Sequence, residues 1–128
     1  MKKLTPKTPD CFKTLIGIPY SQKDCWGIVV EFYKTAFEIE LKNYYTEIPT
    51  TRDMARNLIY SNMGDFEEVK DAPQYGDILL IKMFGVESHI AVYIGNDTML
   101  HTTAHSGCCI DRVLRWKHLV VGYYRIKS

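Results

Sequence analysis

Residues 88–102, SHIAVYIGNDTMLHT, hold two runs of alternating apolar residues separated by Gly-Asn-Asp at positions 95–97. Alternation with a period of two is typical of β-strands, and a Gly-Asn-Asp sequence favours a tight hairpin turn. The stretch therefore predicts two neighbouring antiparallel strands. His89 and His101 lie twelve positions apart and almost symmetrically about the turn, so the hairpin would bring their imidazoles together on one sheet face.

Helical periodicity precedes this hairpin, and strand periodicity surrounds it. Apolar residues at helical spacing predict a helix over residues 25–37, capped by Asp24, and a second helix over residues 51–62. Strands are expected over residues 76–85, 88–96, 98–104, 108–116 and 120–128. Helices followed by a meandering sheet predict an α+β fold, with N-terminal helices packed on a C-terminal antiparallel sheet of about five strands.

Composition limits the classes of protein to consider. The 128 residues contain no evident linker or repeat, so we expect a single domain over residues 1–128. A net charge of +1 gives no electrostatic reason to expect nucleic acid as a partner. No window of about 18 apolar residues predicts a membrane span. The N-terminal residues lack the apolar run of a signal peptide, so we expect synthesis in the cytoplasm and, in that compartment, reduced thiols.

Cys25 opens the first predicted helix and is the candidate nucleophile. A cysteine attacks as its thiolate, and both a helix N-terminus and a neighbouring imidazole lower the pKa of a thiol. Strand alternation favours His89 as the base and His101 as the residue that orients it. A single cysteine in this position is more often a packed core residue, so the assignment depends on the combination.

Four blocks, in order, resemble the NlpC-type cell-wall cysteine peptidases, a papain-like superfamily. They are Asp-Cys-Trp-Gly at residues 24–27, Gly-Asp at 76–77, His-Ile-Ala-Val-Tyr at 89–93, and a Gly-Asn turn followed by a histidine at 95–101. The segment VVGYYRI also matches the family's closing strand. Trp26 stands where the family usually has serine. A tryptophan at this position resembles the variant in the peptidase domains of tailed-phage tail-tip proteins.

This resemblance implies a papain-like fold and hydrolysis of peptide bonds in peptidoglycan stem peptides, commonly the γ-D-glutamyl-diaminopimelate bond. It implies Cys25, His89 and His101 as catalytic residues, without a metal or another cofactor. The substrate-binding positions that it implies are Tyr20, Asp24 and Trp26. The interval between Tyr20 and Cys25 is shorter than in many relatives. The implied partners are the bacterial stem peptide and other phage tail-tip proteins, with a virion as the location.

Other interpretations stay open. One is a structural zinc domain with four candidate ligands, which are His101, His105, Cys108 and Cys109. The interval between the two histidines suits zinc, but strand alternation would point the adjacent cysteines to opposite faces. Another is a non-catalytic structural or plug domain of a tail assembly. A third is acyl transfer, because a thioester can pass its acyl group to an acceptor other than water.

Overall fold

The computed structural model describes residues 11–41, 66–83 and 85–127. One α-helix, two 3-10 helices (η) and six strands occupy these ranges. In chain order they are η1 (Cys11–Thr14), α1 (Cys25–Phe37), β1 (Phe66–Val69), β2 (Ile78–Met83), β3 (Val86–Gly95), β4 (Thr98–Thr103), β5 (Gly107–Arg112), η3 (Val113–Leu119) and β6 (Val120–Ile126). Helix α1 has the predicted bounds, whereas the second predicted helix lies outside the described residues.

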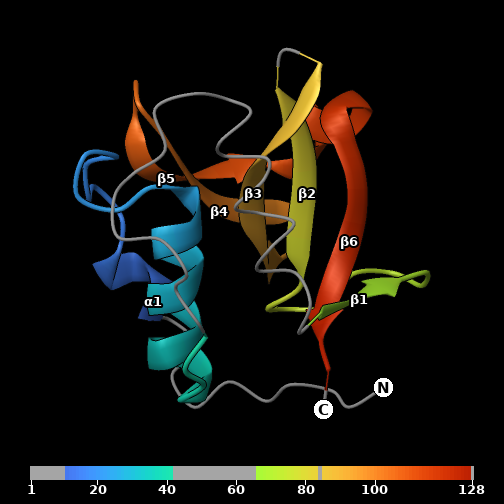
Figure 1. Ribbon diagram of the computed structural model, residues 1–128, viewed down its shortest axis with the longest axis horizontal. Helices are drawn as coiled ribbons and strands as arrows, with labels where there is room; N and C mark the ends of the chain where they lie inside the picture. Colours follow the sequence, from blue (N-terminus) through green and yellow to red (C-terminus); the bar gives the residue numbers. More distant parts are fainter. Residues whose placement is uncertain (1–10, 42–65, 84, 128) are drawn as a thin grey trace.

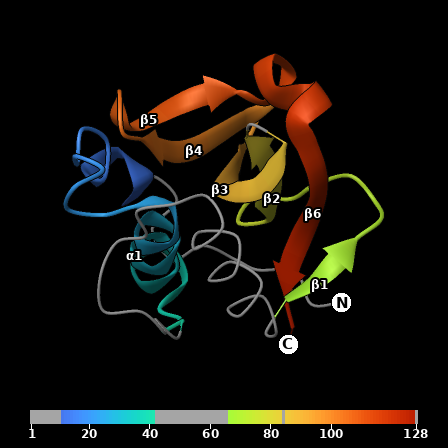
Figure 2. The same cartoon turned by 45° about the horizontal axis from the view of Figure 1, so that its top comes forward.

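The six strands form one antiparallel sheet in the order β1-β6-β2-β3-β4-β5. Helix α1 stands against β3 and β4 on one side of this sheet (Figures 1 and 2). The predicted α+β fold is therefore confirmed, with one strand more than the five expected. The additional strand, β1, is only four residues long, and its sequence FEEV does not alternate.

The hairpin at the centre of the prediction is confirmed. Strand β3 ends at Gly95 and β4 begins at Thr98, which leaves a two-residue turn. Both turn residues have positive φ, 52° at Asn96 and 60° at Asp97, as the type I′ hairpin turn requires. The Thr98 hydroxyl donates a hydrogen bond of 2.6 Å to the Gly95 carbonyl and closes the turn.

The strand predicted over residues 108–116 is wrong in its second half. Strand β5 ends at Arg112, and the chain continues as the 3-10 helix η3. Apolar residues at positions 113, 116 and 119 follow a period of three, which puts them on one side of a 3-10 helix. Val113, Trp116 and Leu119 pack against the sheet face opposite α1, and that packing selects the helix over a longer strand.

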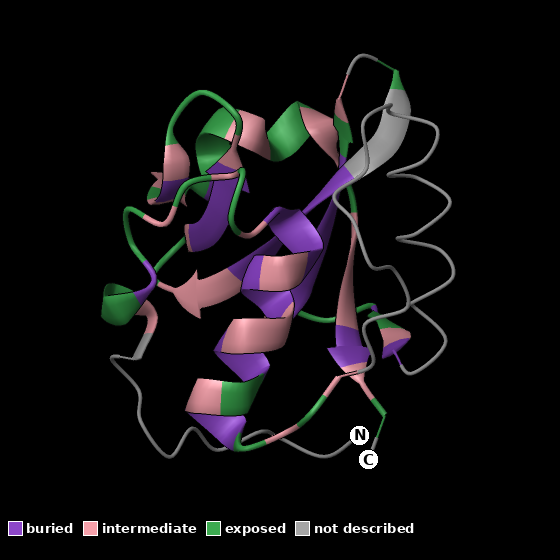
Figure 3. Cartoon of the chain, turned by 60° about the vertical axis from the view of Figure 1, so that its left-hand side comes forward, coloured by how far each residue is buried: buried purple, intermediate pink, exposed green. Residues whose placement is uncertain are grey.

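Each sheet face carries its own apolar cluster. The larger cluster joins the buried side of α1, including Phe32 and Tyr33, to residues of β2, β3 and β4 such as Leu80 and Ile90. In Figure 3 the buried residues recur along α1 on the side that packs against the sheet. The smaller cluster lies under η3 and includes Met99. Apolar clusters therefore cover both faces of the sheet.

The Gly-Asp block at the start of β2 has a structural role. Asp77 accepts two hydrogen bonds of 2.7 Å from Arg125, one from Nε and one from Nη2. Both side chains are buried, and the main-chain N–H of Gln74 donates a further hydrogen bond to the carboxylate. This pair joins the start of β2 to the end of β6. Because each buried charge satisfies the other, removing either side chain would leave its partner without these hydrogen bonds.

Candidate active site

The start of α1 holds Cys25 in a fixed position. Asp24 has extended backbone angles and accepts a 2.9 Å hydrogen bond from the Gly27 amide, which confirms it as the N-cap. Cys25 is therefore the first helical residue, and its side chain is 6% exposed. A Cβ atom on Gly27 would lie 3.3 Å from the capping oxygen, so a glycine here keeps the cap uncrowded.

Burial decides the protonation state of Cys25. It raises the pKa of the thiol to about 12, and the neighbouring Asp24 carboxylate adds to the increase. Hydrogen bonds from the main chain of Ile90, Trp26 and Cys25 itself lower the pKa but do not offset burial. The expectation that the helix terminus would leave this thiol with a lowered pKa is therefore wrong for the free protein.

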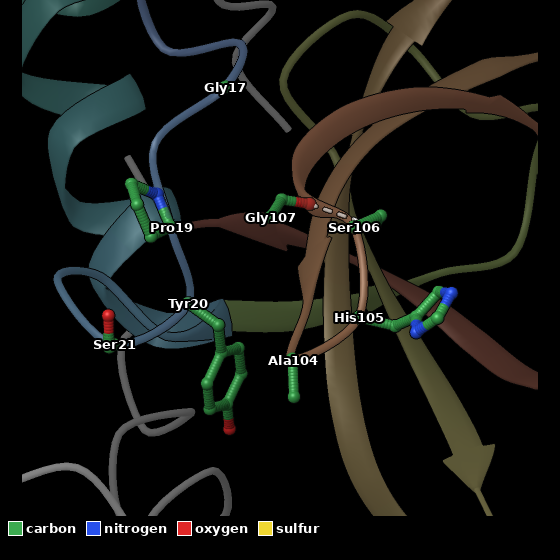
Figure 4. Close-up of a pocket in the computed structure, with 8 residues that line it drawn as sticks. All are labelled: Gly17, Pro19, Tyr20, Ser21, Ala104, His105, Ser106 and Gly107. Atoms are coloured by element: carbon green, nitrogen blue, oxygen red, sulfur yellow. Dashed lines mark hydrogen bonds between the residues drawn. The ribbon is translucent and has the colours of Figure 1, made fainter.

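Tyr20 lies close enough to Cys25 and Asp24 to interact with both. Burial raises the pKa of the Tyr20 phenol to about 12, and repulsion from Cys25 and then Asp24 contributes to the increase. The side chain also lines a cavity of about 410 Å³. Figure 4 shows the chain from Pro19 to Ser21 on one side of this cavity and the turn at residues 104–107 on the other. The structure thus brings three of the predicted site residues together, and of these three Tyr20 is the one that lines the pocket.

The histidine pair is the second part of the site. His89 Nε2 lies 2.9 Å from His101 Nδ1, and the ring centroids are 5.2 Å apart. The predicted cross-strand neighbours are therefore in direct contact, and both are buried. Burial, followed by the effect of His101, lowers the pKa of His89 to about 3. Burial also lowers the pKa of His101, against an opposing effect of Asp111. Both imidazoles are consequently neutral at pH 7.

Cys25 and His89 both adjoin the part of β3 that lies beyond its pairing with β4. Pairing between these strands covers Val92 to Gly95 of β3, and His89 lies beyond that segment. The next residue, Ile90, directs its main-chain N–H at the sulfur of Cys25. The sulfur thus lies at the main chain immediately next to the histidine. His89 packs against Trp116 of η3, on the sheet face opposite the apolar cluster that contains Cys25.

Sequence reasoning missed two residues that touch the histidines. Asp111 Oδ2 lies 3.6 Å from His101 Nε2, and the same oxygen accepts a 2.9 Å hydrogen bond from the Trp116 indole. The Trp116 ring packs against both imidazoles, at 5.2 Å from His101 and 6.0 Å from His89. Alternation could have indicated Asp111, because it shares a face with Cys109, the cross-strand partner of His101. Trp116 could not have been found while its segment was assigned to a strand.

Trp26 does not lie where a substrate contact would require. Its side chain is 3% exposed and packs edge-on against Phe66, with ring centroids 6.5 Å apart. The ring belongs to the apolar cluster beneath α1. This tryptophan supports the helix start and is not among the residues that line the pocket.

The four candidate zinc ligands do not form a cluster. Cys108 is buried in the core, whereas Cys109 on the opposite face contacts the Ser106 hydroxyl. His105 lines the cavity, and His101 faces His89. Among the described residues no group of three or more histidine, cysteine or acidic side chains could hold a metal ion. Cys25, Cys108 and Cys109 are free thiols, and the side chain of Cys11 lies outside the described residues.

Solved structures of NlpC/P60 proteins share this fold. An NlpC/P60 family protein from Bacillus cereus ATCC 10987 is 20% identical with a TM-score of 0.64, covering 98% of this chain and 42% of that one. The NlpC/p60 domain of the peptidoglycan hydrolase SagA is 17% identical with a TM-score of 0.56. The match covers 91% of this chain and 92% of that one. The model of the NlpC/P60 family matches residues 14–124. The chain belongs to the NlpC/P60 family.

A curated relative comes from a phage. Tail tip assembly protein K of Escherichia phage N15 is 24% identical over 82 residues, which make up 61% of this chain and 34% of that protein. The match thus spans about a third of the relative's length. Within the described part of this chain, no helix is both long and apolar enough to cross a membrane.

Proposed function

We propose that this protein is a cysteine peptidase that hydrolyses peptide bonds in peptidoglycan stem peptides, of the γ-D-glutamyl-diaminopimelate type, as a tail-tip component that aids cell-wall penetration. Cys25 is the nucleophile, His89 the base and His101 the residue that orients it. The observation that carries the proposal is the 2.9 Å contact between the two imidazoles, one residue from the main-chain group that faces the Cys25 sulfur. Family membership and the tail-tip relative support the substrate class and the location.

The histidine pair determines which nitrogen serves the nucleophile. His89 Nε2 is engaged with His101, so Nδ1 is the nitrogen left for the thiol. Thiol and imidazole are both neutral in the free protein. Attack by sulfur on the substrate carbonyl carbon is therefore coupled to transfer of the thiol proton to His89 Nδ1. The resulting imidazolium forms only when the negative charge moves from sulfur to the carbonyl oxygen.

The later steps use the same proton and the same base. His89 Nδ1 donates the proton to the departing amine as the carbon–nitrogen bond breaks, which leaves a thioester on Cys25. A water molecule then loses a proton to His89 as it attacks the thioester carbonyl, and the thiolate leaves and regains that proton. The products are a free carboxylate and a free amine, and both catalytic residues return to their starting states.

The helix start supplies donors for the oxyanion. Cys25 is the first residue of α1, so its main-chain N–H has no acceptor four residues earlier within the helix. Together with the N–H of Trp26, it already faces the sulfur. A donor placed at such an oxyanion contributes about 10²–10³ in rate. The cavity beside Tyr20 is the space that we assign to the stem peptide.

Hydrolysis of a defined stem peptide tests the proposal. We expect mass spectrometry to show cleavage of L-Ala-γ-D-Glu-diaminopimelate-D-Ala by the purified protein, with one ¹⁸O from labelled water in the new carboxylate. Cys25→Ala should abolish cleavage, whereas Cys109→Ser, a matched change at a thiol outside the core, should retain it. Undiminished cleavage by Cys25→Ala would refute the assignment. An unlabelled product joined to an added amine would indicate acyl transfer, and binding without cleavage would indicate a plug domain.

Location is tested separately from chemistry. We expect mass spectrometry of purified phage tails to detect peptides of this chain together with tail-tip proteins. The chain's absence from purified tails would remove the tail-tip part of the proposal and leave the hydrolase part intact.

A further inference from the structure

The histidine pair alone does not determine where its shared proton lies. Between His89 Nε2 and His101 Nδ1, at 2.9 Å, either nitrogen can be the donor. If His89 donates, its Nδ1 carries a lone pair and can accept the thiol proton. If His101 donates, His89 carries its own proton on Nδ1 and cannot act as a base there. The proposed chemistry therefore depends on a group that selects the first arrangement.

Asp111 is placed to make that selection. His101 Nε2 is fully buried and has no hydrogen-bond partner among the residues that the structure describes. The Asp111 carboxylate faces it at 3.6 Å. A carboxylate accepts and never donates when ionised, so it favours a proton on His101 Nε2. With its proton on Nε2, His101 has an unprotonated Nδ1 that can only accept a hydrogen bond, so His89 Nε2 must donate to it.

The surroundings of Asp111 keep it ionised and in place. Its Oδ2 accepts from the Trp116 indole at 2.9 Å, and its Oδ1 accepts from the Arg112 amide at 2.9 Å and from Arg115 at 3.3 Å. Burial alone would raise the pKa of Asp111, but these hydrogen bonds and charges outweigh it and lower the pKa. The Trp116 ring, which packs on both imidazoles, fixes the carboxylate relative to the histidines.

We propose that Asp111, held by the Trp116 indole, is a positioning residue that sets the tautomers of His101 and His89 and so leaves the Nδ1 lone pair of His89 free for the thiol proton. The inference rests on the proposed function in one respect, the role of His89 as base. Asp111 touches neither substrate nor sulfur in this scheme. Its effect passes through two imidazoles, and it also stabilises the positive charge that the pair carries after proton transfer.

The tautomers can be measured directly and without substrate. Long-range ¹H–¹⁵N correlation spectra of ¹⁵N-labelled protein at pH 7 distinguish protonated from unprotonated ring nitrogens. We expect both His101 and His89 to carry their proton on Nε2. Asp111→Asn should produce a mixture of tautomers, because an amide can donate to His101 Nε2 as well as accept from it. A proton on Nδ1 of either histidine in the unmodified protein would overturn the inference.

Kinetics then test whether the tautomer matters. We expect Asp111→Asn to lower kcat/KM for the stem peptide about 10- to 100-fold, the loss typical of an outer partner that orients a histidine. Lys117→Gln is the matched control, because it removes an exposed charge from the same 3-10 helix, η3, and none of the hydrogen bonds described for Asp111 involves it. Its kcat/KM should stay within about twofold of that of the unmodified protein, since exposed charges contribute little. A variant whose tautomers match those of the unmodified protein while kcat/KM falls would overturn the inference.

Trp116→Phe provides a second route if Asp111→Asn does not fold. It keeps the ring against the imidazoles and removes only the hydrogen bond to Asp111. We expect a smaller loss of kcat/KM and a detectable second tautomer, and unchanged tautomers would count against the proposal. Inactivity of the unmodified protein would refute the hydrolase while the spectra could still confirm the tautomers. Activity combined with the opposite tautomers would refute only the role of Asp111.

Discussion

The resting protonation state of Cys25 can be tested by the pH dependence of its reaction with a small disulfide such as 2,2′-dithiodipyridine. Only the thiolate reacts, so the rate follows the thiolate fraction. With the pKa of Cys25 raised to about 12 by burial, that fraction at pH 7 is about 10⁻⁵. An ordinary thiol with a pKa of about 8.5 is about 3% ionised at the same pH.

The expected difference in rate is smaller than the difference in ionisation. The ratio of the two thiolate fractions is about 3 × 10³, but a more basic thiolate is intrinsically more nucleophilic. With a Brønsted coefficient of about 0.4–0.5, the higher pKa restores a factor of about 30. Cys25 should therefore react about 100-fold more slowly than a model peptide thiol at pH 7, and its rate should rise about tenfold per pH unit into the alkaline range.

Mass spectrometry of mixed disulfides measures this reaction at each cysteine separately. Cys25→Ser gives the background from the other three cysteines, and His89→Gln tests whether the imidazole contributes to the resting state. We expect His89→Gln to leave the profile nearly unchanged, because both groups are neutral before substrate binds. A plateau of high reactivity between about pH 4 and 7 that disappears in His89→Gln would reveal a preformed thiolate–imidazolium pair and refute the reasoning.

Three further predictions concern stability. The pKa of His89 in the folded protein, about 3, lies below its unfolded value of about 6.5, so the unfolded chain binds the extra proton and stability decreases as the pH is lowered through that interval. Urea unfolding should show that His89→Gln loses up to about 2 kcal/mol less stability than the unmodified protein between pH 6.5 and 5, and equal losses would contradict this. Asp77→Ala should cost about 3–5 kcal/mol by removing the carboxylate that accepts two hydrogen bonds from the buried Arg125, and a cost below about 1 kcal/mol would show that other groups hold this charge. Gly107→Ala places a Cβ atom 3.0 Å from the Ile18 carbonyl at a φ of +68°, so it should lower stability by about 2 kcal/mol, clearly more than Gly85→Ala, which has positive φ and open space; similar losses would show that the contact relaxes.

The sequence alone predicted the parts of this structure that depend on local pattern. Asp24 as cap, the helix that follows it and the 95–97 turn each rest on neighbouring residues, and all three are confirmed. The contact between His89 and His101 was predicted from their near-symmetry about the turn, and in the structure it depends on a register shift between Tyr93 and Gly95 that puts both histidines on one face.

Other features depend on tertiary packing and could not be predicted in this way. The pKa of Cys25 reflects how deeply the helix start is buried, which no local pattern gives. Trp26 faces the core because α1 is rotated to put that residue opposite Phe66. The Asp111–Trp116 hydrogen bond needed both the β4–β5 register and the change from strand to 3-10 helix after Arg112.

The two margins of the sheet bear on how closely copies of this protein can be crowded together. At one margin β1 is only four residues long and carries two glutamates, Glu67 and Glu68. At the other, the chain just before α1 exchanges main-chain hydrogen bonds with β5, from Gly17 to Cys108 and from Cys108 to Ile18. Short, acidic or partly covered margins discourage lateral strand addition between molecules. Dense packing of this domain should therefore not seed fibrous aggregation through its sheet.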